Sequence, residues 1–256
     1  MKSILRDKSL RLFLFLGAFF ITNALVAEFI GVKIFTLETT LGLPSWEFNL
    51  FGEKSGLMFT AGAILWPIVF IMTDIINEYF GPKGVKMLSY ITIGLISYAF
   101  LMIYGAIQLV PPTWWVEVGV DKGVPDMQSA FSQIFGQSNW IIIGSLIAFG
   151  IGQLVDALVF KKVRVKFGEK KIWLRATLST FVSQFIDSFV VLYVAFVLGP
   201  QQWPMSRFFA VGSVNYGYKL MMAILLIPLL YLFRMMIDKY LGEKEANKLR
   251  KQAVHG

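Results

Sequence analysis

The chain contains no cysteine, and its single histidine is His255. Disulfide bonds and thiolate metal sites are therefore excluded. Because His255 lies in the polar C-terminal segment, we expect no histidine metal site and no histidine proton relay in the interior. The sequence also lacks a Walker motif, so the chain is not expected to hydrolyse ATP itself. No cofactor and no metal are expected.

Charged residues are scarce too. They make up 16% of the 256 residues, whereas 56% of the residues are hydrophobic. Soluble domains carry about 25% charged residues, so this composition predicts an integral membrane protein. Hydropathy predicts an all-α fold with six transmembrane helices, since about 20 residues suffice for one crossing. The expected spans cover residues 11–32, 56–80, 86–109, 139–160, 173–198 and 206–236.

These spans predict a single transmembrane domain over residues 1–238, followed by a charged cytoplasmic tail over residues 239–256 that lies free. The first span is too long for the apolar region of a cleavable signal peptide, so we expect none. Neither a linker nor a second domain is indicated. The sequence leaves the oligomeric state open between a monomer and a homodimer.

Positive charge is unevenly distributed along the chain. Nineteen of the 24 Lys and Arg residues lie in segments that share one side of the membrane if the N-terminus is cytoplasmic. The positive-inside rule then places both the N- and C-termini in the cytoplasm. A basic stripe that faces anionic lipid also explains the net charge of +8 without any nucleic acid.

Two outer segments differ in character from the spans. Residues 33–55 contain short alternating stretches, which predict a small β-hairpin. Residues 110–138 include Trp114 and Trp115 and several acidic residues, and a short amphipathic helix is expected around residues 126–135. An aromatic belt and a solvated loop explain both segments better than a binding role.

The expected spans nevertheless carry polar groups, which are costly at membrane depth and usually face a cavity or a partner. The ionisable ones are Glu28, Asp74, Glu78, Asp156, Asp187 and Lys219. Amides lie three or four residues from several of them and therefore on the same helix faces. The candidate substrate site comprises Asn23, Asp74, Gln153, Asp156, Gln184, Asp187, Asn215, Tyr216 and Lys219.

Several of these polar residues have a simpler explanation. Glu78 can reach the cytoplasmic interface and meet Lys83 or Lys86. Glu28 can extend its carboxylate outward to the interface. Asn23 can act as a hydrogen-bonding contact between helices.

The three aspartates are harder to explain by pairing alone. Lys219 can neutralise one carboxylate, but Asp74, Asp156 and Asp187 together exceed what one lysine requires. Carboxylates and amides beside aromatic rings suit a purine-like heterocycle, because a carboxylate accepts two N–H bonds from a guanine-type edge. The same carboxylates could take up protons and couple uptake to a proton gradient.

Four motifs occur in an order that resembles the queuosine precursor transporter family, within the vitamin-uptake-transporter-like group. They are Thr73–Gly81, Gly152–Phe160, Ser179–Asp187 and Asn215–Lys219. The resemblance extends over nearly all of residues 23–219. It implies a bacterial inner-membrane importer of a 7-deazaguanine, such as 7-cyano- or 7-aminomethyl-7-deazaguanine. It also implies a six-helix fold similar to the substrate-binding component of energy-coupling-factor transporters.

Within this resemblance, Asp187 and Gln184 are expected to read the guanine-like edge, and Lys219 to balance charge. Asn23, Gln153 and Asn215 are expected to complete the site, and Asp74 and Asp156 to form an inner polar path. The expected function is that of a secondary carrier coupled to protons or to another ion.

Three alternatives stand beside that function. The first is a substrate-capture subunit that needs a separate ATP-driven module and takes another small polar heterocycle. The second is an intramembrane enzyme, which the lack of cysteine, of a core histidine and of a facing Ser/Lys pair disfavours. The third is a membrane scaffold, which the surplus of interior acids disfavours.

Overall fold

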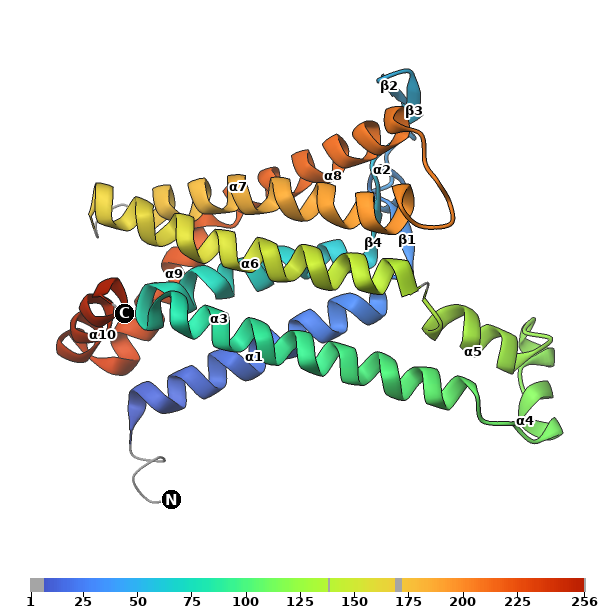
Figure 1. Cartoon of the computed structure of the whole chain (residues 1–256), viewed down its shortest axis with the longest axis horizontal. Coiled ribbons are helices and arrows are strands. Elements are labelled where there is room, and N and C mark those ends of the chain that lie inside the picture. The colour runs from blue at the N-terminus through green and yellow to red at the C-terminus, as the bar shows by residue number, and fades with distance from the viewer. Residues whose placement is uncertain (1–6, 138, 169–171, 256) are drawn as a thin grey trace.

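The computed structural model describes residues 7–137, 139–168 and 172–255. Long helices run beside one another along the longest axis of the molecule (Figure 1). The basic residues Lys2, Arg6, Lys170 and Lys171, which contribute to the expected charge asymmetry, lie outside the described residues. The chain is mostly helical, as expected for an all-α membrane protein.

Five helical segments of the described chain are long and apolar enough to cross a membrane. Four of them are helices α1 (Lys8–Ile30), α3 (Trp66–Ile107), α7 (Ile172–Leu192, continued by the π-helical turn η3, Tyr193–Val197) and α8 (Met205–Leu225). The fifth segment contains α6 (Asn139–Phe167). The expected spans at residues 11–32, 139–160 and 173–198 each coincide with one of these segments.

Helix α3 reverses direction at Gly81. The φ and ψ angles of Gly81 are 70° and −177°, a conformation that is essentially restricted to glycine. Pro82 then starts the second half of the helix, which runs back beside the first (Figure 1). The two halves correspond to the expected spans at 56–80 and 86–109, but a single residue makes the turn between them.

The expected helix over residues 56–65 is wrong. Residues Met58–Thr60 form strand β4 and residues Ala61–Ile64 form a short 3₁₀ helix, η1. Pro67 lies in the first turn of α3, where its missing N–H costs nothing and its fixed φ suits a helix. Pro67 therefore starts the helix.

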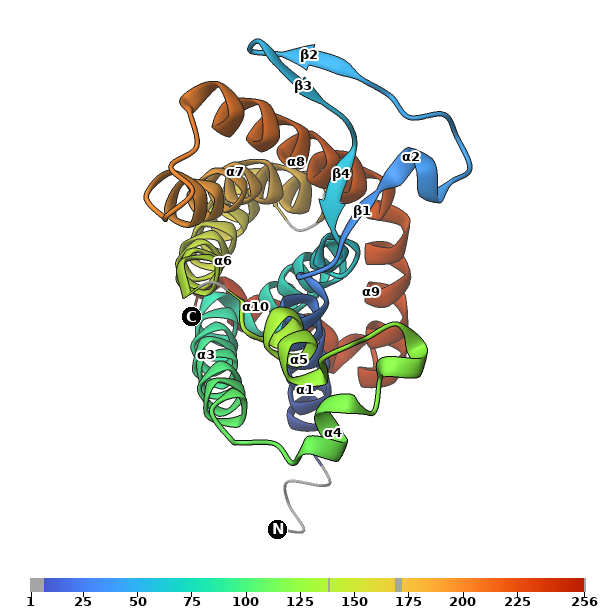
Figure 2. The ribbon, with the colours of Figure 1, turned by 90° about the vertical axis from the view of Figure 1, so that its right-hand side faces the viewer.

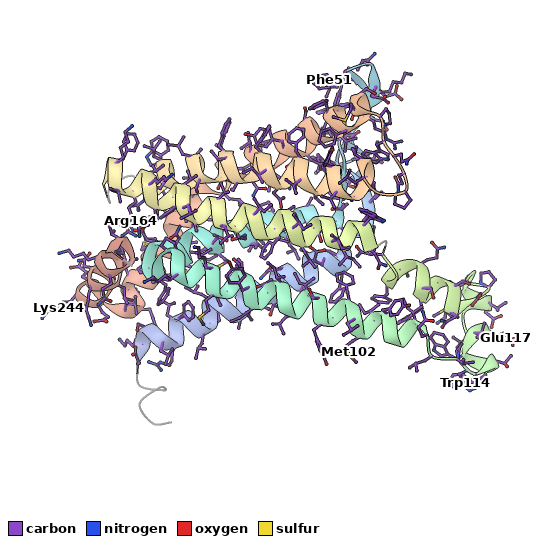
Figure 3. All side chains as sticks on the ribbon, in the orientation of Figure 1. Phe51, Met102, Trp114, Glu117, Arg164 and Lys244 are labelled. Carbon is purple, nitrogen blue, oxygen red and sulfur yellow. The ribbon has the colours of Figure 1, made fainter. Side chains whose placement is uncertain are left out.

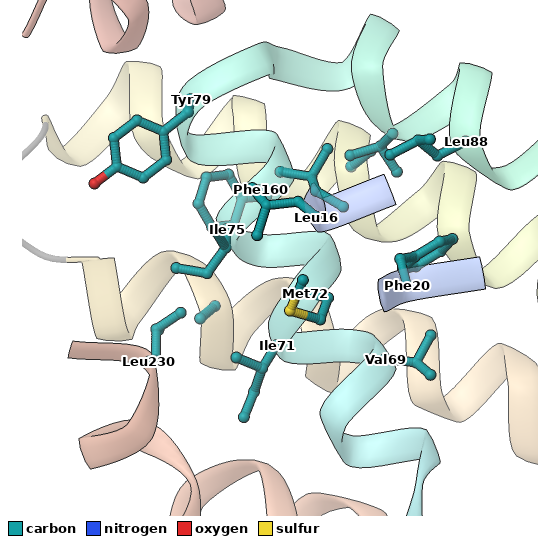
Figure 4. Packing of buried hydrophobic residues seen from close by; sticks show 14 of the residues in the cluster. Leu16, Phe20, Val69, Ile71, Met72, Ile75, Tyr79, Leu88, Phe160 and Leu230 are labelled. Atoms are coloured by element: carbon teal, nitrogen blue, oxygen red, sulfur yellow. The ribbon is translucent and has the colours of Figure 1, made fainter. Parts of the chain in front are cut away.

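The first half of α3 forms the centre of the bundle. Every residue from 69 to 79 is buried, and the surrounding helices form a ring around this segment in the end-on view (Figure 2). Met72 and Ile75 belong to the same apolar core as Phe20 of α1 and Phe160 of α6 (Figure 4). A helix that is buried on all sides carries apolar residues on every face, and the polar residues Asp74 and Glu78 of this segment are therefore buried as well.

The expected span over residues 206–236 is interrupted. Helix α8 ends at Leu225, and a second helix, α9 (Ile227–Leu241), begins after Leu226. Pro228 explains the break, because proline cannot donate the backbone hydrogen bond and its ring clashes with the preceding turn. Pro228 instead occupies the first turn of α9.

Short strands and helices cover one end of the bundle. Strand β1 (Ile34–Thr36), which is followed by the short helix α2 (Leu37–Thr40), pairs with β4, and β2 (Phe48–Leu50) pairs with β3 (Glu53–Ser55). Phe51 and Gly52 join β2 to β3 with positive φ angles, as in the type I′ turns of tight hairpins. The expected β-hairpin is confirmed.

The expected amphipathic helix at the same end is confirmed as α5 (Met127–Phe135). The side chain of Asp126 caps it by accepting hydrogen bonds from the backbone N–H groups of Gln128 and Ser129. Helix α4 (Thr113–Glu117) and the 3₁₀ turn η2 (Val120–Lys122) precede it. Figure 3 shows Phe51, Trp114 and Glu117 at this end and Arg164 and Lys244 at the other.

The C-terminal tail does not lie free. It forms helix α10 (Glu243–His255), which packs against α3 and α6. Ala246 and Ala253 are buried, and the backbone of Ala253 meets Gly81 so closely that a Cβ at Gly81 would lie 2.8 Å from the Ala253 carbonyl oxygen. Residues 246, 250 and 253 recur at helical spacing, so they form one buried face. The division into a domain over residues 1–238 and a tail stays a prediction.

Candidate functional site

A small cavity lies between the first half of α3 and helices α7, α8 and α9. Its volume is about 30 Å³, enough for only one or two water molecules. We call it the central cavity. It is lined by Trp66, Pro67, Phe70, Ile71, Asp74, Ala176, Thr177, Thr180, Gln184, Lys219, Ala223, Leu226, Ile227 and Leu230.

The side chain of Gln184 has no hydrogen-bond partner at the cavity wall. It is 1% exposed, and neither its amide oxygen nor its amide nitrogen is bonded to any described residue. Buried amides are rarely left in this state, because each unsatisfied polar atom costs free energy. Asp74 also lines the cavity. Its carboxylate oxygen Oδ1 lacks a hydrogen-bond partner in the described chain. A ligand or water would satisfy these groups.

An ion pair closes one side of the cavity. The ammonium group of Lys219, on α8, donates to the carboxylate of Asp187, on α7. Both side chains keep some exposure, and Lys219 itself lines the cavity. The pair therefore satisfies two charges while leaving them accessible to a polar ligand.

Polar contacts join the neighbouring seam between α3, α6 and α7. Thr73 donates to the side-chain oxygen of Gln153 at 2.8 Å, and Ser183 donates to Oδ1 of Asp156 at 2.9 Å. The amide nitrogen of Gln153 and Oδ2 of Asp156 remain without partners among the described residues.

Three predicted site residues lie elsewhere. Asn23 and Asn215 each donate to a backbone carbonyl one turn back on their own helix, those of Phe19 and Val211. Tyr216 donates its hydroxyl to the carbonyl of Phe181. None of the three lines the central cavity as the described residues define it. Of the nine predicted residues, Asp74, Gln184 and Lys219 line the cavity, Asp187 pairs with Lys219, and Gln153 and Asp156 lie in the neighbouring seam.

Glu78 does not meet Lys83 or Lys86 at the interface, as one reading of the sequence suggests. It is 0% exposed, and arginines from three other helices surround its carboxylate. Arg175 is 2.8 Å away, Arg164 3.5 Å and Arg234 3.7 Å. Three cations around one buried carboxylate make a structural lock one helical turn beyond Asp74.

Glu28 does not extend to the interface either. Its side chain is buried and accepts a hydrogen bond from Ser145 of α6 at 3.2 Å. The backbone carbonyl of Glu28 also accepts from the side chain of Gln137. The outward-reaching interpretation of Glu28 is therefore wrong, because α6 covers it.

Some cavity residues carry little signal in the sequence. Thr177 and Thr180 face the cavity one turn apart, but a threonine in an apolar helix is common. Leu226 and Ile227 line it only because the α8–α9 break turns them inward, for which Pro228 is the signal. Nothing in the sequence distinguishes Arg164 and Arg175 from the other basic residues between positions 161 and 175, and their shared partner Glu78 is not evident from it either.

One family of known proteins matches this chain. The family model described as "Putative vitamin uptake transporter" matches residues 60–233. That stretch contains every residue that lines the central cavity. No solved structure matches the chain significantly.

Three bacterial proteins are similar to the chain. A "Probable queuosine precursor transporter" of Bacillus subtilis (strain 168) is 27% identical over 186 residues, which cover 72% of this chain and 76% of that relative. The "Queuosine precursor transporter" of Escherichia coli (strain K12) is 24% identical over 197 residues, covering 76% and 82%. A "Probable queuosine precursor transporter" of Haemophilus influenzae (strain ATCC 51907 / DSM 11121 / KW20 / Rd) is 23% identical over 170 residues, covering 65% and 64%.

Proposed function

Since the chain belongs to the vitamin uptake transporter family, we propose that it is a membrane carrier that imports a queuosine precursor, a 7-deazaguanine. The observation that carries this proposal is the unpaired amide of Gln184, buried at a cavity that also holds Asp74 and Lys219. The names of the three relatives supply the substrate class. We propose no catalytic centre and no cofactor.

The cavity offers the groups that a guanine-like base requires. A carboxylate can accept two N–H bonds from the amino and imino groups of such an edge, and the Gln184 amide can donate to the neighbouring carbonyl. Trp66 and Phe70 both line the cavity, with ring centroids 6.4 Å apart, and can contact the flat face of the base. Lys219 would exchange its bond with Asp187 for one to the ligand.

The cavity must enlarge before it can accept this ligand. Sites for small molecules measure about 300–1,000 Å³, roughly ten times the 30 Å³ found here or more. The α8–α9 break supplies a place for that movement, because Leu226 and Ile227 line the cavity at the interruption. Interrupted helices at the substrate site are typical of secondary carriers.

The proposed topology has six crossings, with both termini in the cytoplasm of a bacterial inner membrane. The crossings are α1, the two halves of α3, α6, α7 with η3, and α8. Helix α1 begins and α10 ends at the same end of the bundle (Figure 1). The first half of α3 is short, but protein surrounds it, so its ends need no contact with lipid.

Uptake by cells that cannot synthesise the precursor tests the proposal. Such cells, supplied with 7-cyano-7-deazaguanine, should regain queuosine in their tRNA when they express the wild-type chain. Gln184→Leu, Asp187→Asn and Lys219→Met should lose most of this rescue. Asp121→Asn removes an exposed outer charge and should retain it. Failure of the wild type would refute the substrate, whereas normal rescue by all three site variants would refute the site.

Reconstitution distinguishes this carrier from the first alternative that the sequence leaves, a capture subunit for an ATP-driven module. Purified protein alone in liposomes should accumulate the precursor when an ion gradient is imposed. If accumulation requires ATP and a second protein, the carrier proposal is wrong.

A further inference from the structure

Asp74 of α3 and Asp156 of α6 are buried carboxylates without a cation. They are 4% and 1% exposed, and neither forms an ion pair with another described residue. Glu78 and Asp187 differ in this respect, because arginines hold the first and Lys219 holds the second. Neither aspartate therefore has an ion-pair partner of its own in the described chain, although the charge of Arg175, which pairs with Glu78, also acts on Asp74.

Neutral hydroxyl groups surround the two carboxylates. Ser183 donates to Oδ1 of Asp156 at 2.9 Å, and the hydroxyl of Ser179 lies beside both aspartates. Asp74 and Asp156 are close enough to interact electrostatically with each other. One oxygen of each, Oδ1 of Asp74 and Oδ2 of Asp156, has no donor anywhere in the described chain.

Two buried amides give independent evidence of unsatisfied hydrogen-bonding groups in this region. Both side-chain atoms of Gln184 and the amide nitrogen of Gln153 lack partners among the residues described. Gln184 is 1% exposed and lines the same cavity as Asp74. The region therefore has unused hydrogen-bonding capacity on neutral groups as well as on the two acids.

We propose that Asp74 and Asp156 together hold one proton, and that its release toward the cytoplasm and reloading from outside couple import to a proton gradient. Two adjacent carboxylates in an apolar interior do not both ionise readily, since like charges and burial both oppose it. A proton needs only one carboxylate lone pair. A metal cation would need several ligands, and no group of three or more histidine or acidic side chains that could hold one occurs among the described residues.

Other charged groups face this pair, and nearly all of them already have partners. One turn beyond Asp74 lie Glu78 and Arg175, and across the cavity lies the Asp187–Lys219 pair. The remaining groups at the cytoplasmic end are Arg164 and Arg234 around Glu78, and Arg250 with Asp238. Glu28, at the outer end of α1, and Glu38, in α2, are the other buried carboxylates that the described structure leaves without a cation. The experiment must therefore separate Glu28 and Glu38 from the aspartate pair.

Infrared spectroscopy detects the proton directly and does not depend on the substrate. Purified wild-type protein in lipid nanodiscs at neutral pH should show the C=O stretching band of a protonated carboxylic acid. Asp74→Asn and Asp156→Asn should each remove that band, while Glu28→Gln, Glu38→Gln and the exposed control Asp121→Asn should leave it. A band lost only in Glu28→Gln or in Glu38→Gln, or absent from the wild type, overturns the proposal.

The cation itself is identified by changing the buffer. The acid band should be the same with sodium ions and with choline at one pH. If sodium removes the band, the site binds a metal cation and the proton assignment is wrong. Because asparagine resembles a protonated aspartate in shape and charge, the variants should fold, and size-exclusion chromatography checks this.

The coupling part of the proposal rests on the proposed function and has its own test. In proteoliposomes, import of 7-cyano-7-deazaguanine by the wild type should carry protons inward, which a trapped pH dye detects, and Asp156→Asn should carry at least tenfold fewer protons per precursor molecule. A proton-to-precursor ratio equal to that of the wild type would overturn the coupling role. If the wild type does not carry the precursor at all, the proposed function is wrong. The infrared measurement tests the proton site separately, because it does not depend on the substrate.

Discussion

Replacing Glu78 by glutamine should destabilise the protein more than any surface charge change. The carboxylate of Glu78 lies 2.8 Å from Arg175, and both side chains are 0% exposed. Arg164 and Arg234 lie within 3.7 Å of the same carboxylate. Removing one partner of a buried pair typically costs about 3–5 kcal/mol, because the remaining charge is left uncompensated.

A matched control exists at the outer hairpin. Glu47 and Lys54 form a pair at 3.5 Å whose side chains are 73% and 84% exposed. Exposed pairs contribute about 0–1 kcal/mol, so Glu47→Gln should change stability by no more than that. The two substitutions alter charge and shape identically, and only burial distinguishes them.

Unfolding in mixed micelles, followed by tryptophan fluorescence, measures both free energies. The chain has seven tryptophans, which makes the signal strong. Adding Arg175→Gln to Glu78→Gln should recover part of the loss, since the uncompensated cation is then gone. If Glu78→Gln and Glu47→Gln lower the free energy of unfolding by amounts within about 1 kcal/mol of each other, the arginine cluster is not a structural lock and the reasoning fails.

Three further predictions follow from the same structure. Gly81→Ala should lower the free energy of unfolding by about 1–3 kcal/mol from backbone strain alone, and contact with Ala253 should lower it further. Gly94→Ala, in open space on the same helix, is the control and should be neutral or slightly stabilising in the same unfolding assay. Gln184→Leu should raise the unfolding free energy by about 1–3 kcal/mol while abolishing precursor uptake, because it removes an unpaired buried amide; a loss of stability would count against an empty ligand site. Asp156→Asn should change the midpoint of thermal unfolding little at neutral pH, in contrast to Glu78→Gln, and a large drop would mean that Asp156 is ionised and compensated.

Local signals in the sequence predict part of this architecture. Asp126 before an amphipathic stretch predicts helix α5, and the alternating stretches of residues 33–55 predict the hairpin, because both depend on neighbouring residues. The spans follow from length and hydropathy for the same reason. Pro228 indicates the break between α8 and α9, but hydropathy alone does not reveal this break because the residues on both sides are apolar.

Contacts between distant segments were not predictable from one sequence. Arg175 meets Glu78 across 97 positions, and the choice of arginine over the nearby lysines depends on how α7 is rotated against α3. Asn215 lies one turn from Lys219 on α8, but its amide donates to the carbonyl of Val211 and the residue does not line the cavity. The hydroxyl of Tyr216 donates to the carbonyl of Phe181 on α7. The docking of α10 requires the Gly81 turn, whose lack of a side chain makes room for Ala253.

The one-residue turn at Gly81 also bears on how the protein enters the membrane. The first half of α3 carries Asp74 and Glu78, and an acidic residue at the centre of a span opposes insertion by about 2.5–3.5 kcal/mol, whereas each Leu or Ile favours it by only about 0.3–0.6 kcal/mol. That half is therefore a poor candidate for leaving the translocon alone. With no loop to separate them, the two halves must pass into lipid as one hairpin, in which the apolar second half carries the polar first half. Biogenesis then delivers the acidic centre of the bundle before α6 and α7 arrive to surround it.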